Sequence, residues 1–165
     1  MYFRYTDALA TNWERRKACK DKWNFNCGCD RCTDPTEFGT FASGIICTHC
    51  DSGILLIDNK DKKWTCLNCN YQISHSEIWV SILDPLSRAK MDCVSDGKNA
   101  DENILEQFLW TASKMLHENH VWIIDMEYRL LFLYSKKIKV MKSKKRPIQL
   151  RMIQLGLHLL QVTIF

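Results

Sequence analysis

Cys47-Thr48-His49-Cys50 and Cys66-Leu67-Asn68-Cys69, with fifteen residues between them, decide the fold of the middle of this chain. Two C-x2-C pairs at this spacing are typical of a four-cysteine zinc site. Each pair spans one edge of the tetrahedron, and a hairpin between the pairs brings them together. The apolar run 54–57 and Trp64 predict the strands of that hairpin, and Gly53 is expected to need a positive φ. The sequence therefore predicts a small β-ribbon with zinc at one end.

This ribbon site is expected to be structural, because four thiolates leave no open coordination position for chemistry. His49 and His75 could also act as ligands, but with four cysteines available both are expected at the surface. Between residues 44 and 75 the Asp and Lys side chains balance in number. A neutral ribbon lacks the phosphate attraction that dominates nucleic-acid binding. Protein contact or scaffolding is the role that we expect for it.

A second cluster, Cys27-Gly28-Cys29-Asp30-Arg31-Cys32, lies upstream of the ribbon. Its segment has too few aliphatic residues to be held together by burial, so zinc is the expected staple. Three thiolates do not complete a tetrahedral zinc site, which normally has four ligands. Cys19 and Cys93 are the candidates for the fourth ligand within the chain. Cys19 is expected to be a buried free thiol on a helix, and Cys93 could be either.

The flanking segments predict helices, so the expected fold class is mixed: a small zinc-stapled α+β part followed by an all-α region. Thr11 and Glu14 have the form of a capping box and predict a helix over 12–22. Polar residues around Gly97 predict a linker over 92–102. Further helices are expected around 122–134 and over 148–165. One apolar helix face is predicted before them, formed by Ile104, Leu105, Phe108, Leu109, Ala112, Met115 and Leu116.

Composition is that of a globular protein, with 46% hydrophobic and 25% charged residues in a chain of 165. Nine cysteines at close spacings suit metal chelation in a reducing compartment better than disulfides, so we expect an intracellular protein of the cytoplasm, the nucleus or both. The first twenty residues lack a secretory-type apolar run. Residues 148–165 are near the lower limit for a membrane span. Their polar side chains make packing against other helices the expected alternative, and no membrane is favoured.

The net charge of +4 is a local feature. Seven basic residues fall in the run 136–146, and without them 16 basic residues face 19 acidic ones. Such a run is usually a solvated face, with nuclear targeting or an acidic partner as the other readings. Nucleic-acid binding is not favoured by this distribution.

Several motifs in the first half of the chain resemble one family. They are Tyr5-Thr6-Asp7, Glu14-Arg15-Arg16-Lys17, Trp23-Asn24-Phe25-Asn26 with the three-cysteine segment, and Asp34-Pro35-Thr36-Glu37-Phe38-Gly39-Thr40. Together they resemble the end of the SET domain and the post-SET segment of SMYD-type protein lysine methyltransferases. The added four-cysteine ribbon is similar to the arthropod branch of that family. The helices around His117-Glu118-Asn119-His120 are similar to its TPR-like C-terminal region.

This resemblance implies a division of the chain. It places the end of the SET domain at 1–22, the post-SET zinc segment at 23–43, the ribbon and connector at 44–91, the linker at 92–102 and the helical region at 103–165. In the family the fourth post-SET ligand is a cysteine of the SET core that follows an Asn-His motif. No Asn-His-x-Cys motif occurs in this chain. The resemblance thus implies a C-terminal fragment, with the SET core and most of the cofactor pocket upstream.

The resemblance also implies roles for three aromatic residues. Tyr5 matches the tyrosine that lines the lysine channel and orients the amine. Trp23 and Phe25 match positions that pack beside S-adenosylmethionine. The alternative for Trp23 and Phe25 is that two rings shield a zinc cluster, and for Tyr5 that it is an exposed tyrosine.

Three functions therefore stand as hypotheses. The first is a zinc-binding part of an S-adenosylmethionine-dependent protein-lysine methyltransferase, inactive alone, whose partner is a protein substrate. The second is a stand-alone zinc-ribbon module that binds proteins. The third is a catalytically dead scaffold of the same family. For the chain alone we expect about one tight zinc ion, in the ribbon, and no measurable affinity for S-adenosylmethionine.

Overall fold

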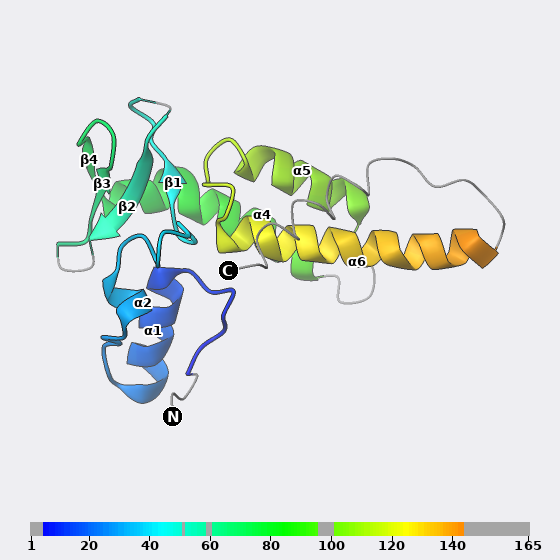
Figure 1. The fold of residues 1–165 in the computed structure, drawn as a ribbon, viewed down its shortest axis with the longest axis horizontal. Helices are drawn as coiled ribbons and strands as arrows, with labels where there is room; N and C mark the ends of the chain where they lie inside the picture. The colour runs from blue at the N-terminus through cyan, green and yellow to red at the C-terminus, as the bar shows by residue number, and fades with distance from the viewer. Residues whose placement is uncertain (1–4, 51, 59–60, 96–100, 144–165) are drawn as a thin grey trace.

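The computed structural model describes residues 5–50, 52–58, 61–95 and 101–143. Figure 1 shows an N-terminal helical segment below a small antiparallel sheet, and helices that run from the sheet side by side. The predicted mixed fold class is confirmed at this level, with a small sheet, several helices and two cysteine groups. No helix among these residues is both long and apolar enough to cross a membrane.

Helix α1 (Asn12–Trp23) begins at the predicted capping box. The Thr11 hydroxyl accepts a hydrogen bond from the Glu14 N–H, and the Glu14 carboxylate accepts one from the Thr11 N–H at 2.7 Å. The helix ends where Asn24 adopts a left-handed conformation with φ 53°. The expectation of a helix over 12–22 is confirmed. The segment after it includes one helical turn, α2 (Asp30–Thr33), which was not predicted from the sequence.

The sheet is the predicted ribbon with one short strand added on each side. Its strands run antiparallel in the order β1 (Ile45–Ile46), β2 (Ile54–Asp58), β3 (Lys63–Cys66) and β4 (Gln72–Ser74). In the central hairpin Leu55 pairs with Cys66, and Ile57 pairs with Trp64. Leu55, Trp64 and Cys66 are fully buried. The inward face of the hairpin therefore carries its apolar side chains and one cysteine into the core.

After the sheet the chain stays helical from residue 75 to residue 95, through α3 (His75–Ile78), a π-helical turn η1 (Trp79–Leu83) and α4 (Asp84–Ser95). Pro85 lies two residues after the last residue of this π-helical turn. A proline ring crowds the carbonyl four residues earlier, and a π turn is one way to accommodate such a site in a helix. Residues 92–95, where the sequence placed the start of a linker, continue α4.

The C-terminal helices are α5 (Glu102–Ala112) and α6 (Val121–Ser143), which lie side by side in Figure 1. The Tyr134 hydroxyl on α6 donates a 2.6 Å hydrogen bond to Glu106 on α5. The predicted apolar face is correct in part: Leu105, Phe108 and Ala112 are buried, but Ile104 is 42% exposed. The helix predicted over 148–165 lies outside the described residues.

The loop between α5 and α6 joins the helices to the ribbon. Leu116 forms a β-bridge with Ile45, and the Ile46 N–H donates to the Met115 carbonyl at 2.8 Å. The Trp122 indole N–H donates to Glu14 at 3.2 Å, so the start of α6 also contacts the start of α1. One buried core runs from the sheet into the helices as a result.

Candidate zinc centres and aromatic cluster

The four ribbon cysteines lie together at one end of the hairpin. The sulfur atoms of Cys47 and Cys69 are 3.8 Å apart, and those of Cys50 and Cys66 are 3.7 Å apart. In a tetrahedral site with Zn–S bonds of about 2.3 Å, neighbouring sulfur atoms are about 3.8 Å apart. All four sulfur atoms lie within 4.8 Å of one another. This ribbon site fits a zinc ion without rearrangement.

The two C-x2-C turns have matching backbone geometry. The His49 N–H donates to the Cys47 sulfur, and the Asn68 N–H donates to the Cys66 sulfur, both at 3.4 Å. The Asn68 side-chain amide also points to the Cys50 sulfur at 3.8 Å. These donors stabilise thiolates, the form in which cysteine binds a metal.

The ribbon thiols differ widely in pKa because they form hydrogen bonds with one another. Burial opposes ionisation of Cys50, but the Ser52 N–H and the neighbouring thiols outweigh it and lower the pKa to about 6. For Cys69 the Tyr71 N–H favours the thiolate, yet burial and hydrogen bonds with the other thiols raise the pKa to about 12. Cys50 therefore ionises readily, and its thiolate opposes ionisation of the neighbouring thiols. A dication removes that resistance, so zinc binding displaces protons from this site.

Glycine is needed at residue 53 because a side chain would not fit there. The expectation that Gly53 has a positive φ is wrong. Its φ is not positive; in this ribbon the positive values fall on Lys62 and Asn70. A Cβ at Gly53 would collide with the Cys66 sulfur and lie 3.0 Å from the Cys50 sulfur. Glycine is needed there because the ribbon site packs directly against the backbone.

The second cluster brings Cys27, Cys29 and Cys32 together, with their sulfur atoms within 4.8 Å of one another. Cys32 is 2% exposed, whereas Cys29 is at the surface. Burial is the largest of the effects that raise the pKa of Cys32 to about 11, although Arg15 opposes it. The structure thus groups the three residues as the sequence predicts, and they could hold a metal ion.

A buried ion-pair network fixes this cluster to α1. The Glu37 carboxylate accepts hydrogen bonds from Arg15 on α1 at 2.6 Å and from Arg31 in the cysteine segment at 3.0 Å. The Ser43 hydroxyl donates to the other oxygen of Glu37. The Asn12 side chain donates to the Cys32 carbonyl at 3.2 Å. Sequence reasoning did not assign these roles, because the partners are distant in the chain and only the fold brings them together.

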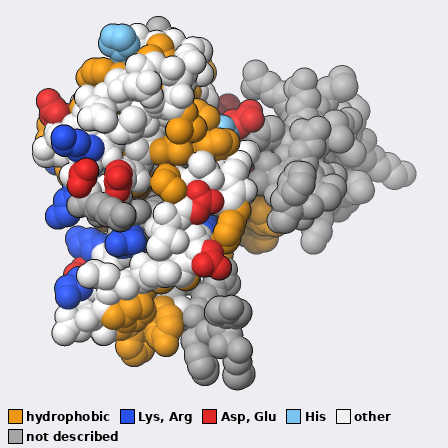
Figure 2. Space-filling view, turned by 60° about the vertical axis from the view of Figure 1, so that its left-hand side comes forward, with side chains coloured by type: hydrophobic (Ala, Val, Ile, Leu, Met, Phe, Trp, Pro, Cys, Tyr) orange, Lys and Arg blue, Asp and Glu red, His pale blue; other side chains and the backbone are white. Residues whose placement is uncertain are grey.

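Tyr5, Trp23 and Phe25 meet in one aromatic cluster. The ring of Tyr5 lies edge-on to that of Trp23, with centroids 5.8 Å apart, and to that of Phe25, with centroids 5.3 Å apart. Tyr5 is 49% exposed and Trp23 is 56% exposed. Figure 2 shows apolar side chains gathered at the lower end of the molecule, the end at which Figure 1 places the C-terminal turn of α1.

The remaining candidate ligands lie elsewhere. His49 is exposed, as expected, and stacks on Tyr71. His75 is half-buried, which corrects its expected surface position, and its Nδ1 accepts a hydrogen bond from the Trp64 indole at 3.1 Å. Cys93 is buried, with its sulfur 4.0 Å from the Ile104 carbonyl. Cys19 is also buried, on the face of α1 that carries Asn12 and Arg15, and its sulfur is not among the three that lie within 4.8 Å of one another.

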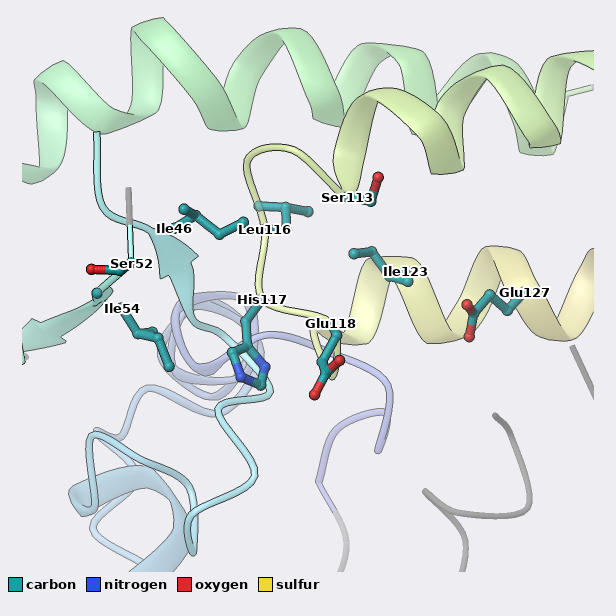
Figure 3. A pocket seen from close by; sticks show the side chains of 10 residues that line it. Ile46, Ser52, Ile54, Ser113, Leu116, His117, Glu118, Ile123 and Glu127 are labelled. Atoms are coloured by element: carbon teal, nitrogen blue, oxygen red, sulfur yellow. The ribbon is translucent and has the colours of Figure 1, made fainter. Parts of the chain in front are cut away.

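A pocket of about 520 Å³ lies between the ribbon and the helices (Figure 3). Ile54 lines it from the ribbon, His117 and Glu118 from the loop after α5, and Glu127 from α6. His117 Nδ1 already accepts from the Asn119 N–H at 3.1 Å. None of the aromatic or three-cysteine residues lines this pocket, so it is separate from the site that the sequence predicts.

A scan against models of known protein families finds no match for this chain.

Proposed function

We propose that this chain forms the zinc-bound, channel-lining part of an SMYD-type protein-lysine methyltransferase. The observation that carries the proposal is the aromatic cluster. Tyr5 is distant in sequence from Trp23 and Phe25, yet its ring meets both of theirs, and Phe25 is two residues before Cys27. These are the residues to which the family resemblance assigns the lysine channel and the cofactor wall.

The cluster has chemistry that suits a lysine channel. Aromatic ring faces attract an ammonium group, and partly exposed rings leave room for one. The Tyr5 hydroxyl can orient an incoming amine. S-adenosylmethionine, when bound, would supply the methyl group. Two zinc centres would hold the segments that carry the rings, and correct placement of the reacting atoms contributes most of the rate in such reactions.

The chain contributes only one wall of a cofactor site. Trp23 and Phe25 offer apolar surface for the cofactor, and the family resemblance assigns the rest of the cofactor pocket to the SET core. We therefore expect no binding of S-adenosylmethionine to the 165-residue chain in calorimetry. Micromolar binding would contradict this shared-pocket model.

The activity test uses the complete gene product, loaded with zinc, with radiolabelled S-adenosylmethionine and histones as a lysine-rich substrate. Tyr5→Phe is expected to lower kcat at least about tenfold, because orientation of the amine is lost. Trp23→Ala is expected to raise KM and lower kcat. Trp110→Ala is the matched control, since Trp110 is a 65% exposed tryptophan on α5, and it should leave both values unchanged.

If the zinc-loaded gene product transfers no methyl group, the methyltransferase proposal fails. Loss of activity in Trp110→Ala equal to that in Trp23→Ala would also contradict the assigned role of the aromatic cluster. The zinc-ribbon interaction module and the inactive scaffold would then be the functions left to test.

A further inference from the structure

We propose that the pocket between the ribbon and the helices is a docking site for a segment of a partner protein that carries a lysine or arginine flanked by apolar residues. The pocket is separate from the aromatic cluster, because its lining includes none of Tyr5, Trp23 and Phe25. The inference therefore concerns a second site and does not depend on methyl transfer.

One wall of the pocket is apolar and comes from two neighbouring strands. Ile46 on β1 pairs with Ile54 on β2, and both side chains are half-buried. Leu116, in the loop after α5, and Ile123, near the start of α6, are buried residues that also line the pocket. Half-buried apolar side chains beside a cavity offer surface that a ligand can remove from water.

Main-chain hydrogen bonds hold the two sides of the pocket together. The Ile46 N–H donates to the Met115 carbonyl at 2.8 Å, and the His117 N–H donates to the Gly44 carbonyl at 3.0 Å. The ring of His117 also packs on that of Phe41, with centroids 5.1 Å apart. A ligand would therefore meet a pocket that is already formed, which lowers the entropic cost of binding.

Three polar side chains of the pocket already have hydrogen-bond partners and carry no charge. The Ser52 hydroxyl accepts from the Asn68 amide at 3.2 Å, and the Ser113 hydroxyl donates to the Trp110 carbonyl at 3.0 Å. His117 accepts through Nδ1, as described above. Burial lowers the pKa of His117, although the adjacent carboxylate opposes this, so the ring adds no positive charge at neutral pH.

The charge of the pocket is negative. Its two charged side chains are Glu118 and Glu127, and no lysine or arginine of the described residues lines it. In Figure 3 both lie towards one end of the pocket, and Ile54 lies towards the other. No ion pair among the described residues involves Glu118. The nearby amine of Lys114 instead lies 3.1 Å from the centre of the Trp110 ring.

A lysine or arginine side chain matches both parts of this pocket. Its long stem is apolar and can cover the isoleucine wall, while its cationic head can reach the carboxylates. The volume of about 520 Å³ lies in the range of pockets that hold drug-sized ligands, so flanking apolar residues of the partner also have room. A phosphate-bearing partner would meet charge of its own sign.

The binding test uses the zinc-loaded 165-residue chain and short blocked peptides in which leucine alternates with lysine, glutamine or glutamate. Calorimetry measures the affinity, and amide NMR shifts locate the site. We expect the lysine peptide to bind at least about tenfold more tightly than the glutamine peptide, and the glutamate peptide to bind most weakly, because charge complementarity selects the partner. The largest shifts should fall on Gly53, Ile54 and Ser113.

Variants of Glu118 test the source of the selectivity. Glu118 is exposed, so its replacement should leave the fold intact. Glu118→Gln should weaken binding of the lysine peptide about threefold, and Glu118→Lys at least about tenfold, since attraction is first lost and then replaced by repulsion. Asp21→Asn is the matched control, because it removes an exposed carboxylate of α1 and should leave the affinity unchanged.

The inference is overturned if the lysine and glutamine peptides bind equally well, or if Glu118→Lys and Asp21→Asn have the same affinity for the lysine peptide. It also fails if the lysine peptide does not bind at millimolar concentration. Shifts on Trp23 and Phe25 in place of Gly53 and Ser113 would assign the binding to the aromatic cluster and contradict the docking site. None of these readouts uses methyl transfer, so failure here is distinct from failure of the proposed function.

Discussion

Gly53 packs directly against two sulfur atoms of the ribbon site. The Gly53→Ala variant would force the new Cβ against the Cys66 sulfur, so either the backbone or the thiolate must move. We expect zinc affinity of the ribbon to fall at least about tenfold in chelator competition. Gly28→Ala is the control, because a Cβ at Gly28 meets nothing within 4 Å. Equal zinc affinity in the two variants would contradict the spatial requirement.

His120 is a second residue with a testable consequence. It is fully buried, its Nδ1 accepts from the Trp122 N–H, and burial, followed by Lys90 and His117, lowers its pKa to about 3. Below the ordinary histidine pKa of about 6.5 the unfolded chain takes up a proton that the folded chain excludes. Stability should therefore fall as the pH drops from about 6.5 towards 3, by up to about 1.4 kcal/mol per pH unit.

The His120→Gln variant should lose this contribution to the acid-side slope in urea unfolding at several pH values. Zinc ligands also take up protons in acid, so the comparison is the difference between each variant and the unmodified chain. His49→Gln is the control, because His49 is exposed. An acid slope in His120→Gln as steep as that of the control would show that His120 is not held neutral.

At this scale the sequence located both cysteine groups, because thiol spacing alone reports a metal site. It assigned the positive φ of the ribbon to the wrong residue, Gly53. Positive φ values fall on Lys62 and Asn70, and the need for glycine at residue 53 comes from a sulfur atom across the hairpin. Such a contact depends on three-dimensional packing and leaves no local signal.

The link between α1 and the three-cysteine segment rests on Glu37, whose side chain is fully buried between Arg15 and Arg31. In Glu37→Ala the Arg15 guanidinium would remain buried without its carboxylate. Breaking a buried pair in this way costs about 3–5 kcal/mol, which urea unfolding would measure. Arg88→Ala removes an exposed pair with Asp84 and should have a small effect. A loss in Glu37→Ala no larger than in Arg88→Ala would contradict the bridging role.

Helix and strand boundaries were predicted correctly where neighbouring residues in the sequence determine them. The α1 start followed from Thr11 and Glu14, since a capping box needs only four residues. The π-helical turn Trp79–Leu83 and the extension of α4 to Ser95 were not predicted. These depend on how Ile78, Ile82 and Leu83 pack into the core, which the sequence pattern does not specify.

Across the whole molecule the ribbon and the helices share one core. The sequence divided them at a linker, yet the loop before α6 forms a bridge between Leu116 and Ile45 and hydrogen bonds to residues 42–46. The buried cysteines of the ribbon, Cys47 and Cys66, belong to the same cluster as Trp122 on α6. Loss of ribbon zinc should therefore weaken the helical part as well as the hairpin.

Zinc bound by the cysteine clusters organises the fold proposed for this chain. X-ray absorption at the zinc edge of the purified, zinc-loaded 165-residue chain tests it most directly. We predict a first shell of four sulfur atoms at about 2.3 Å from the zinc ion. A shell dominated by nitrogen or oxygen neighbours, or a folded chain that retains no zinc, would contradict it.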